Sequence, residues 1–137
     1  MNLIRKTYDT TEVQITSFQS SKGITEYHIF FQQTNCLEDF HTQLQHIQDV
    51  YAHSVEELPG NPVAIFRRYF LSDVTNQTDE LMERERLSPY CALSIVQQAP
   101  MNGTKIALWA WLQTGVPTQV LPNGLFEARH GAYGQLF

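Results

Sequence analysis

Three side chains that could do acid–base chemistry lie close together near the C-terminus, in the segment GLFEARHGAYGQLF. Glu127, Arg129 and His130 fall within four positions. In an extended segment, Glu127 and Arg129 would point the same way and His130 the opposite way. An arginine can bind a carboxylate through paired hydrogen bonds, and glutamate or histidine can transfer protons. The pattern predicts a group that binds and acts on an acid, the alternative being an edge strand with solvated charges.

Two adjacent arginines, Arg67 and Arg68, lie in the apolar segment VAIFRRYFL. Successive side chains of a strand point to opposite faces, so one arginine must point into a helix-covered core or an interface. A buried guanidinium needs a partner, and Asp73 or Glu80 could supply it as a structural ion pair. The alternative is that one of the arginines binds an anion.

The cysteines and histidines do not form a recognisable metal or redox motif. Cys36 and Cys91 are far apart in the sequence and are predicted to be free thiols. Cys91 could be a nucleophile, but a thiol in an apolar strand is more often an inert core residue. His41 and His46 are five residues apart rather than four, which does not suit a helical metal pair. We expect no metal and no cofactor.

Composition narrows the class of protein. A chain of 137 residues with 42% hydrophobic content is predicted to form a single domain, residues 1–137. The formal charge of −5, with only nine lysines and arginines, argues against nucleic acid as a partner. The sequence has no apolar run of membrane-spanning length and no signal-peptide core, so we expect a cytoplasmic protein without a membrane partner.

The first half of the chain predicts a β-hairpin and a long helix. EVQITSFQ and ITEYHIFFQQ alternate apolar and polar residues, as antiparallel strands with one buried face do. Apolar residues then recur at helical spacing from Leu37 to Leu58, which predicts a helix over about residues 36–58, capped by Thr34 or Asn35. The segment LPGNP ends this helix, and Gly60 can take a left-handed conformation there.

The second half predicts a central strand, a shorter helix and a second hairpin. VAIFRRYFL is apolar on both faces, and the helix that follows it can be capped by Ser72 or Asp73. In that helix Leu81 and Met82 form a thin apolar stripe, and the run 83–86 is expected to face water. YCALSIVQQ and KIALWAWLQ are predicted to pair as a hairpin across APMNGT.

This order, β-β-α-β-α-β-β, predicts an α+β fold in which two helices pack on one face of a mixed sheet. The other face must then carry several large apolar side chains: Phe30, Phe66, Phe70, Trp109 and Trp111. An exposed patch of that kind usually marks an interface, so we expect the chain to form an oligomer.

Two sequence blocks within residues 35–112 resemble the Rid family, also called the YjgF or L-PSP endoribonuclease family. EDFHTQLQHIQDVYAHS followed by VAIFRRYFLSD is similar to that family's helix, strand, linker and aspartate. SPYCALSIVQQAP followed by GTKIALWAWL is similar to its proline-led strand, short turn and lysine-started final strand. The resemblance implies a chorismate-mutase-like fold and a homotrimer with a barrel-like centre and ligand clefts between subunits. Residues 113–137 form a C-terminal extension beyond it.

The residues that carry the family's imine and enamine deaminase activity are not matched. Its carboxylate-binding arginine falls on Tyr90 or Cys91 here, and its water-orienting glutamate falls on Ala107 or Trp109. We therefore expect a divergent member that binds a small carboxylic or aromatic acid in an intersubunit cleft lined by Tyr90, Cys91 and Trp109. Glu127, Arg129 and His130 would supply catalysis, as in a hydrolase, deaminase or chorismatase-like enzyme. The alternative is a non-catalytic ligand-binding or scaffold subunit of a homo- or hetero-oligomer.

Overall fold

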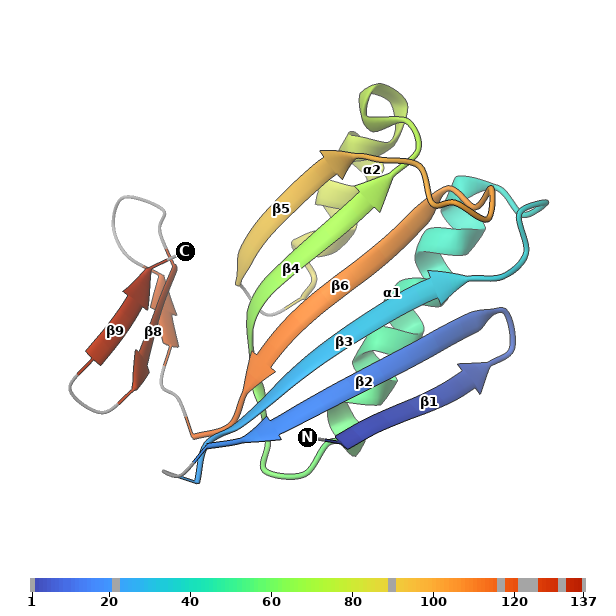
Figure 1. The fold of residues 1–137 in the computed structure, drawn as a ribbon. Helices are drawn as coiled ribbons and strands as arrows, with labels where there is room; N and C mark the ends of the chain where they lie inside the picture. Colours follow the sequence, from blue (N-terminus) through green and yellow to red (C-terminus); the bar gives the residue numbers. More distant parts are fainter. Residues whose placement is uncertain are drawn as a thin grey trace.

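The fold is described from a computed structural model that covers residues 2–20, 23–88, 91–115, 118–120, 126–130 and 133–136. Two helices and two sheets make up these residues (Figure 1). The helices are α1 (Phe40–Glu57) and α2 (Val74–Glu85). The strands are β1 (Asn2–Tyr8), β2 (Thr11–Gln19), β3 (Thr25–Gln33), β4 (Val63–Leu71), β5 (Ala92–Gln97), β6 (Ile106–Gln113), β7 (Thr118–Val120), β8 (Phe126–His130) and β9 (Tyr133–Leu136).

The main sheet is mixed, with six strands in the order β1-β2-β3-β6-β4-β5. β2 and β3 pair antiparallel, as the sequence predicted, and β4 and β5 are parallel strands joined through α2. β3 and β4 are both antiparallel to β6, so they run parallel to each other across it. Figure 1 shows both helices on the same face of this sheet. The α+β class, the mixed sheet and the two helices are thus confirmed.

The predicted hairpin between β5 and β6 is wrong. β5 pairs with β4, whereas β6 pairs with β3 on one side and β4 on the other. α1 connects β3 to β4, and these two strands are not adjacent in the sheet but lie one strand apart. β6 is apolar on both faces and fills this central position, where Ile106, Leu108 and Leu112 become fully buried.

The sequence analysis also missed β1, the first strand of the sheet. Its segment NLIRKTY is mostly exposed and lacks the alternation that marks a half-buried strand. It pairs antiparallel with β2 in a tight hairpin, in which Asp9 takes a positive φ of 53°. Ladder hydrogen bonds hold this edge strand, together with the contacts of Lys6 and Tyr8 with Glu57 of α1.

The hydrophobic core lies between the sheet and the helices. Alternate residues of the four strands β2, β3, β6 and β4 point into it, which is the period-2 pattern of a sheet covered on one face. The helices contribute Leu44 and Ile47 from α1 and Leu81 from α2, all fully buried. The core cluster is Val13, Ile15, Tyr27, Ile29, Phe31, Leu44, Ile47, Tyr69, Leu71, Leu81, Ile106, Leu108, Ala110 and Leu112.

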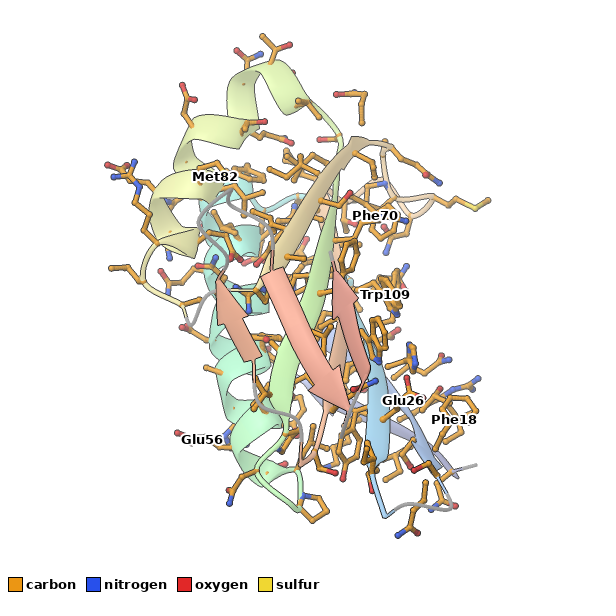
Figure 2. The ribbon with its side chains drawn as sticks, turned by 90° about the vertical axis from the view of Figure 1, so that its left-hand side faces the viewer. Phe18, Glu26, Glu56, Phe70, Met82 and Trp109 are labelled. Atoms are coloured by element: carbon orange, nitrogen blue, oxygen red, sulfur yellow. The ribbon has the colours of Figure 1, made fainter. Side chains whose placement is uncertain are left out.

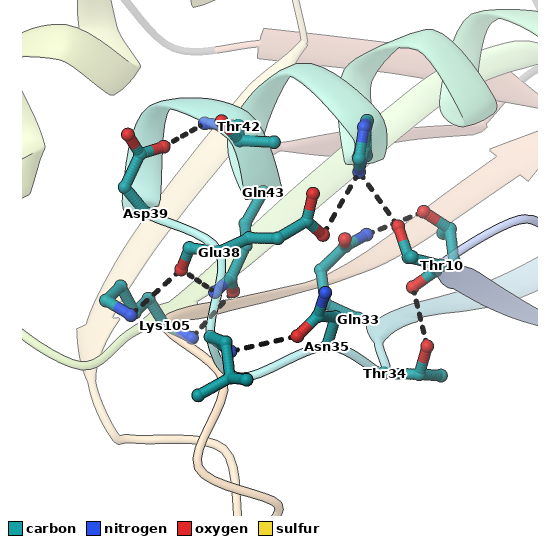
Figure 3. A network of polar contacts seen from close by, with 12 residues as sticks. Thr10, Gln33, Thr34, Asn35, Glu38, Asp39, Thr42, Gln43 and Lys105 are labelled. Atoms are coloured by element: carbon teal, nitrogen blue, oxygen red, sulfur yellow. Dashed lines mark hydrogen bonds and ion pairs between the residues drawn. The ribbon is translucent and has the colours of Figure 1, made fainter.

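A polar network attaches the start of α1 to the start of β6 (Figure 3). Asp39 is the N-cap, and its carboxylate accepts a hydrogen bond from the Thr42 backbone N–H at 2.8 Å. The fully buried Gln43 accepts from the Lys105 backbone N–H at 2.8 Å and donates to the Glu38 carbonyl oxygen at 2.8 Å. One amide side chain thus satisfies two backbone groups that neither the helix nor the sheet can pair.

The helix boundaries differ from the prediction at one end. α1 begins at Phe40 rather than residue 36, because Asp39 and not Thr34 or Asn35 caps it. Leu37 therefore lies outside the helix and is 91% exposed. Asp73 caps α2, and Gly60 after α1 has a φ of +86°, as predicted. A Cβ at Gly60 would lie 2.8 Å from Thr114 Cγ2, so this position also needs the absence of a side chain.

β7, β8 and β9 form a separate antiparallel sheet in the order β7-β8-β9. In the part of the chain that the structure describes, none of its strands pairs with the six-stranded sheet. β8, which carries the C-terminal candidate residues, is the middle strand of this small sheet rather than an edge strand.

Replacing Gln43 should destabilise the fold. Gln43→Ala removes the acceptor of the part-buried Lys105 backbone N–H and one of the donors to the Glu38 carbonyl, and an unsatisfied backbone group costs about 1–3 kcal/mol. We expect urea unfolding to show a loss of roughly 2 kcal/mol. Glu56→Ala, at an exposed position of the same helix, is the control and should change stability by less than about 0.5 kcal/mol. Equal effects of the two changes would contradict the bridging role of Gln43.

Candidate ligand-binding face

The face of the six-stranded sheet opposite the helices carries most of the large aromatic side chains. We call this surface the open face. Figure 2 shows Phe18, Glu26, Phe70 and Trp109 on it, on the side of the sheet away from the helices. Within the described residues no third layer packs on this face, and both helices lie on the other one (Figure 1). Its residues are Phe18, Glu26, His28, Phe30, Gln32, Phe66, Arg68, Phe70, Ser94, Trp109 and Trp111.

Strand register sets these residues in rows across the sheet. In one row Trp111 pairs with His28 of β3 and Phe66 of β4. In the next, Trp109 pairs with Phe30 and with Arg68, which in turn pairs with Ser94 of β5. In the third, Ala107 pairs with Gln32 and with Phe70. The face thus combines aromatic side chains with Arg68 in its middle row, which ends at Arg5 on the edge strand β1.

The aromatic rings contact one another in a continuous array. His28 stacks on both tryptophans, with ring centroids 5.7 Å from Trp109 and 5.9 Å from Trp111. Phe18 meets His28 edge-on at 5.8 Å, and Phe66 meets Trp109 at 5.6 Å. Such contacts fix the rings in place, so the array is a preformed surface for flat apolar groups.

A carboxylate holds one end of this array. Glu26 Oε1 accepts a hydrogen bond from Trp111 Nε1 at 2.8 Å and lies 3.7 Å from His28 Nε2. Gln113 Nε2 also donates to Glu26 Oε1, at 3.4 Å. Glu26 therefore orients both the indole of Trp111 and the imidazole of His28.

Arg68 lies in the middle row and has a different environment from Arg67. Its Nε donates to Ser94 Oγ at 3.2 Å, and its guanidinium carbon lies 5.3 Å from the centre of the Phe66 ring. Among the described residues, no carboxylate lies within salt-bridge distance of Arg68. The open face thus presents a guanidinium on an aromatic floor.

Two hollows open on the same face and share Phe30 and Gln32. The first, of about 380 Å³, lies over β1, β2 and β3 and is lined by Arg5, Glu12 and Gln14 among others. The second, of about 360 Å³, lies over Ala107 and is bounded by Phe70 and the loop 98–101. Each has the size of a small-molecule site.

Arg67 points to the helix face and forms a buried ion pair. It is 2% exposed, and its Nη2 lies 2.7 Å from Glu85 Oε2. Its Nη1 donates to the Tyr51 hydroxyl at 3.1 Å, and the Tyr69 hydroxyl donates to Glu85 Oε1. Burial lowers the pKa of Arg67. The neighbouring Tyr51, Cys91 and Glu85 groups raise it by a larger amount, so the pKa lies above its ordinary value. Arg67 is therefore a structural cation with its partner in place.

The expected partner of the buried arginine was wrong, as was the expectation that residues 83–86 all face water. Glu85 is buried beside Arg67, whereas Glu80 lies at 2.5 Å from His41 and Asp73 caps α2. Glu85 sits on the turn of α2 that faces β4, one turn after Leu81. The i, i+4 spacing from Leu81 was the available signal, since it puts Glu85 on the core side of the helix.

Cys91 is buried rather than displayed on the open face. It is 5% exposed and packs in a small cluster with Ile65 and Trp111. Burial raises the pKa of its thiol to about 11, although the Arg67 charge opposes the shift. A thiol with this pKa stays protonated at neutral pH and is a poor nucleophile.

The other proposed site residues are distributed as follows. Trp109 is at the centre of the open face, and Tyr90 lies outside the described residues. Glu127, Arg129 and His130 are on β8, where Glu127 pairs with Leu136 and Arg129 with Gly134.

The histidines of α1 pair singly with carboxylates. His41 pairs with Glu80, His46 with Glu38 and His53 with Glu57. In the described part of the chain, no group of three or more potential ligands is placed to hold a metal ion.

Comparison of the chain with protein-family models, with curated proteins and with solved structures found no match. Of the helices in the described ranges, none combines the length and apolar character needed to cross a membrane. The candidate site therefore rests on the geometry of the open face.

The two thiols should differ strongly in reactivity. We expect iodoacetamide at pH 8 to label the exposed Cys36 and to leave Cys91 unmodified in the folded protein, because burial raises the Cys91 pKa to about 11. Mass spectrometry of peptides from native and urea-unfolded samples measures this. Rapid labelling of native Cys91 would show that its thiol is accessible and contradict the buried placement.

Removing the charge of Glu85 should destabilise the protein substantially. Glu85→Gln leaves Arg67 buried beside a neutral amide, and breaking one side of a buried ion pair costs about 3–5 kcal/mol. Glu83→Gln, at an exposed position of the same helix, is the matched control and should be nearly neutral. Chemical denaturation of both variants gives the comparison. A loss below about 1 kcal/mol for Glu85→Gln would mean that Arg67 finds another partner or water.

Proposed function

We propose that this chain is a divergent Rid/YjgF-like subunit that assembles through its open face and binds a small carboxylic or aromatic acid in the cleft formed there. The observation that carries the proposal is the aromatic open face itself, with Trp109 and Phe70 on the central strands and an arginine between them. Monomeric proteins rarely leave such a surface uncovered. A second copy would bury the rings and enclose the hollows.

The order of elements from β2 to β6 supports the family assignment. It is β-β-α-β-α-β-β, the order from which the resemblance was drawn. In the chorismate-mutase-like arrangement the sheets of three subunits surround a barrel-like centre. A homotrimer of this kind would use the open face as its inner surface.

The chemistry on the open face favours binding over the family's usual deamination. Where that reaction needs a glutamate on the final strand, β6 carries Ala107 and Trp109. Glu26 is engaged by Trp111 and His28, and Cys91 is buried and protonated. If the chain is catalytic, as a hydrolase, deaminase or chorismatase-like enzyme, the groups would be Glu127, Arg129 and His130 of β8.

Light scattering and a thermal-shift screen test the proposal together. We expect a mass three times the 15.8 kDa of one chain, and a raised melting temperature with at least one small acid such as benzoate or pyruvate. Phe70→Glu places a charge in the proposed interface and should yield monomers, because an unpaired buried charge disfavours assembly.

Met82→Glu is the control, since Met82 is an apolar side chain that is 40% exposed but lies on α2. It should leave the mass unchanged. A monomeric wild-type chain would rule out assembly through the open face, and a trimer that no acid stabilises would leave only the scaffold function.

A further inference from the structure

We infer that Arg68 is the carboxylate-binding group of the open face, and that its ligand is an acid whose carboxylate is attached to a flat ring. This rests on the proposed function, since it names the residue and the ligand class of the same cleft. It also moves the anion-binding role from Arg129 on β8 to the central strand β4 of the main sheet.

The alternation of β4 gives its two arginines opposite tasks. Arg67 points into the helix layer, where Glu85 neutralises it at 2.7 Å. Arg68 is on the open face, where its cross-strand neighbours are Trp109 on one side and Ser94 on the other. The ion pair holds Arg67 on the helix face, and because side chains of a strand alternate, Arg68 then lies on the open face.

The hydrogen bonding of Arg68 leaves its outer edge available for a ligand. The bond from Nε to Ser94 Oγ holds the guanidinium at its inner edge. Within the described residues, no hydrogen bond from either Nη of Arg68 is found, and no carboxylate is within 4.0 Å. The two Nη groups of a guanidinium match the two oxygens of a carboxylate, which favours this anion over a single-point acceptor.

The surroundings of Arg68 specify the rest of the ligand. Phe66 lies under the guanidinium, and Phe70 and Trp109 are its neighbours along and across the strands. A carboxylate bound there must place its substituent against aromatic rings, and a flat ring packs on such rings better than an alkyl chain does. The 360 Å³ hollow bounded by Phe70 begins one row further along the sheet and gives room for ring substituents.

The apolar rings around Arg68 also strengthen its attraction to a bound carboxylate. The attraction between two charges grows as the local dielectric falls, so the Coulombic attraction between Arg68 and a carboxylate is stronger once a second subunit excludes water. The remaining basic side chains of the first hairpin are less suitable. Lys6 is paired with Glu57 at 3.1 Å, and Arg5 lies on the exposed edge strand β1.

Isothermal titration calorimetry with benzoate, acetate and benzamide tests the inference on the full chain. The wild type should bind benzoate at least tenfold more tightly than acetate, and should not bind benzamide, which has the ring but no charge. Arg68→Gln should lose at least tenfold in benzoate affinity. Arg68→Lys should also weaken binding, because an ammonium cannot make the paired contact.

Arg86→Gln, at an exposed position at the end of α2, is the control and should bind benzoate as the wild type does. Arg129→Gln is measured beside it to test β8. Circular dichroism and light scattering of every variant show whether fold and assembly are kept.

Each other outcome has a definite meaning. Wild-type affinity in Arg68→Gln would overturn the inference while leaving the proposed acid-binding function in place, and loss of binding in Arg129→Gln alone would return the role to β8. No benzoate binding to the wild type, with another acid bound, would overturn the ring-bearing class. If no acid binds at all, both proposals fail. If both Arg68 variants dissociate into folded monomers, Arg68 pairs with the partner copy's carboxylate, and the inference is overturned.

Discussion

The buried ion pair between Arg67 and Glu85 constrains the rest of this structure. It joins the central strand β4 to α2 at a position where both side chains are buried, the Tyr51 hydroxyl accepting a hydrogen bond from Arg67 and the Tyr69 hydroxyl donating one to Glu85. Because side chains of a strand alternate, the position of Arg67 on the helix face also places the residues before and after it in β4 on the open face. A shift of one residue would bury Phe66, Arg68 and Phe70 and expose Arg67. That register would also move Tyr69 and Leu71 out of the core, where both are buried, so it is strongly disfavoured.

The two faces of the sheet consequently have different chemistry. The helix face is covered by α1 and α2, and Gln43 and Glu85 there hydrogen-bond to Lys105 and Arg67. The open face carries stacked rings around His28, with Trp109 at the centre and Arg68 held by Ser94. The first face determines stability, whereas the second has the composition of a recognition surface, with aromatic residues and arginine enriched.

The proposed relation to the Rid family rests on the order of the elements rather than on active-site residues. In that proposal the positions of the family's arginine and glutamate carry other residues, among them the buried Cys91 and the aromatic Trp109. A cation is nevertheless present on the same sheet, one strand away from β5, as Arg68. An anion site can move between neighbouring strands of a sheet without a change of fold, because adjacent strands lie about 5 Å apart and arginine is long.

Local patterns in the sequence determined much of this architecture. The alternation in β2 and β3, the apolar spacing of α1, the Asp73 cap and the turn at Gly60 each depend on residues close together in the chain. They also placed Phe30, Phe66, Phe70, Trp109 and Trp111 on a common face. The insertion of β6 between β3 and β4 and the pairing of Arg67 with Glu85 were decided only by the tertiary structure. A two-sided apolar strand has no local signal for its neighbours, and an ion pair depends on how a helix turn meets a distant strand. For the same reason, the environment that separates Arg68 from Arg67 could be recognised only once the sheet and helices were assembled.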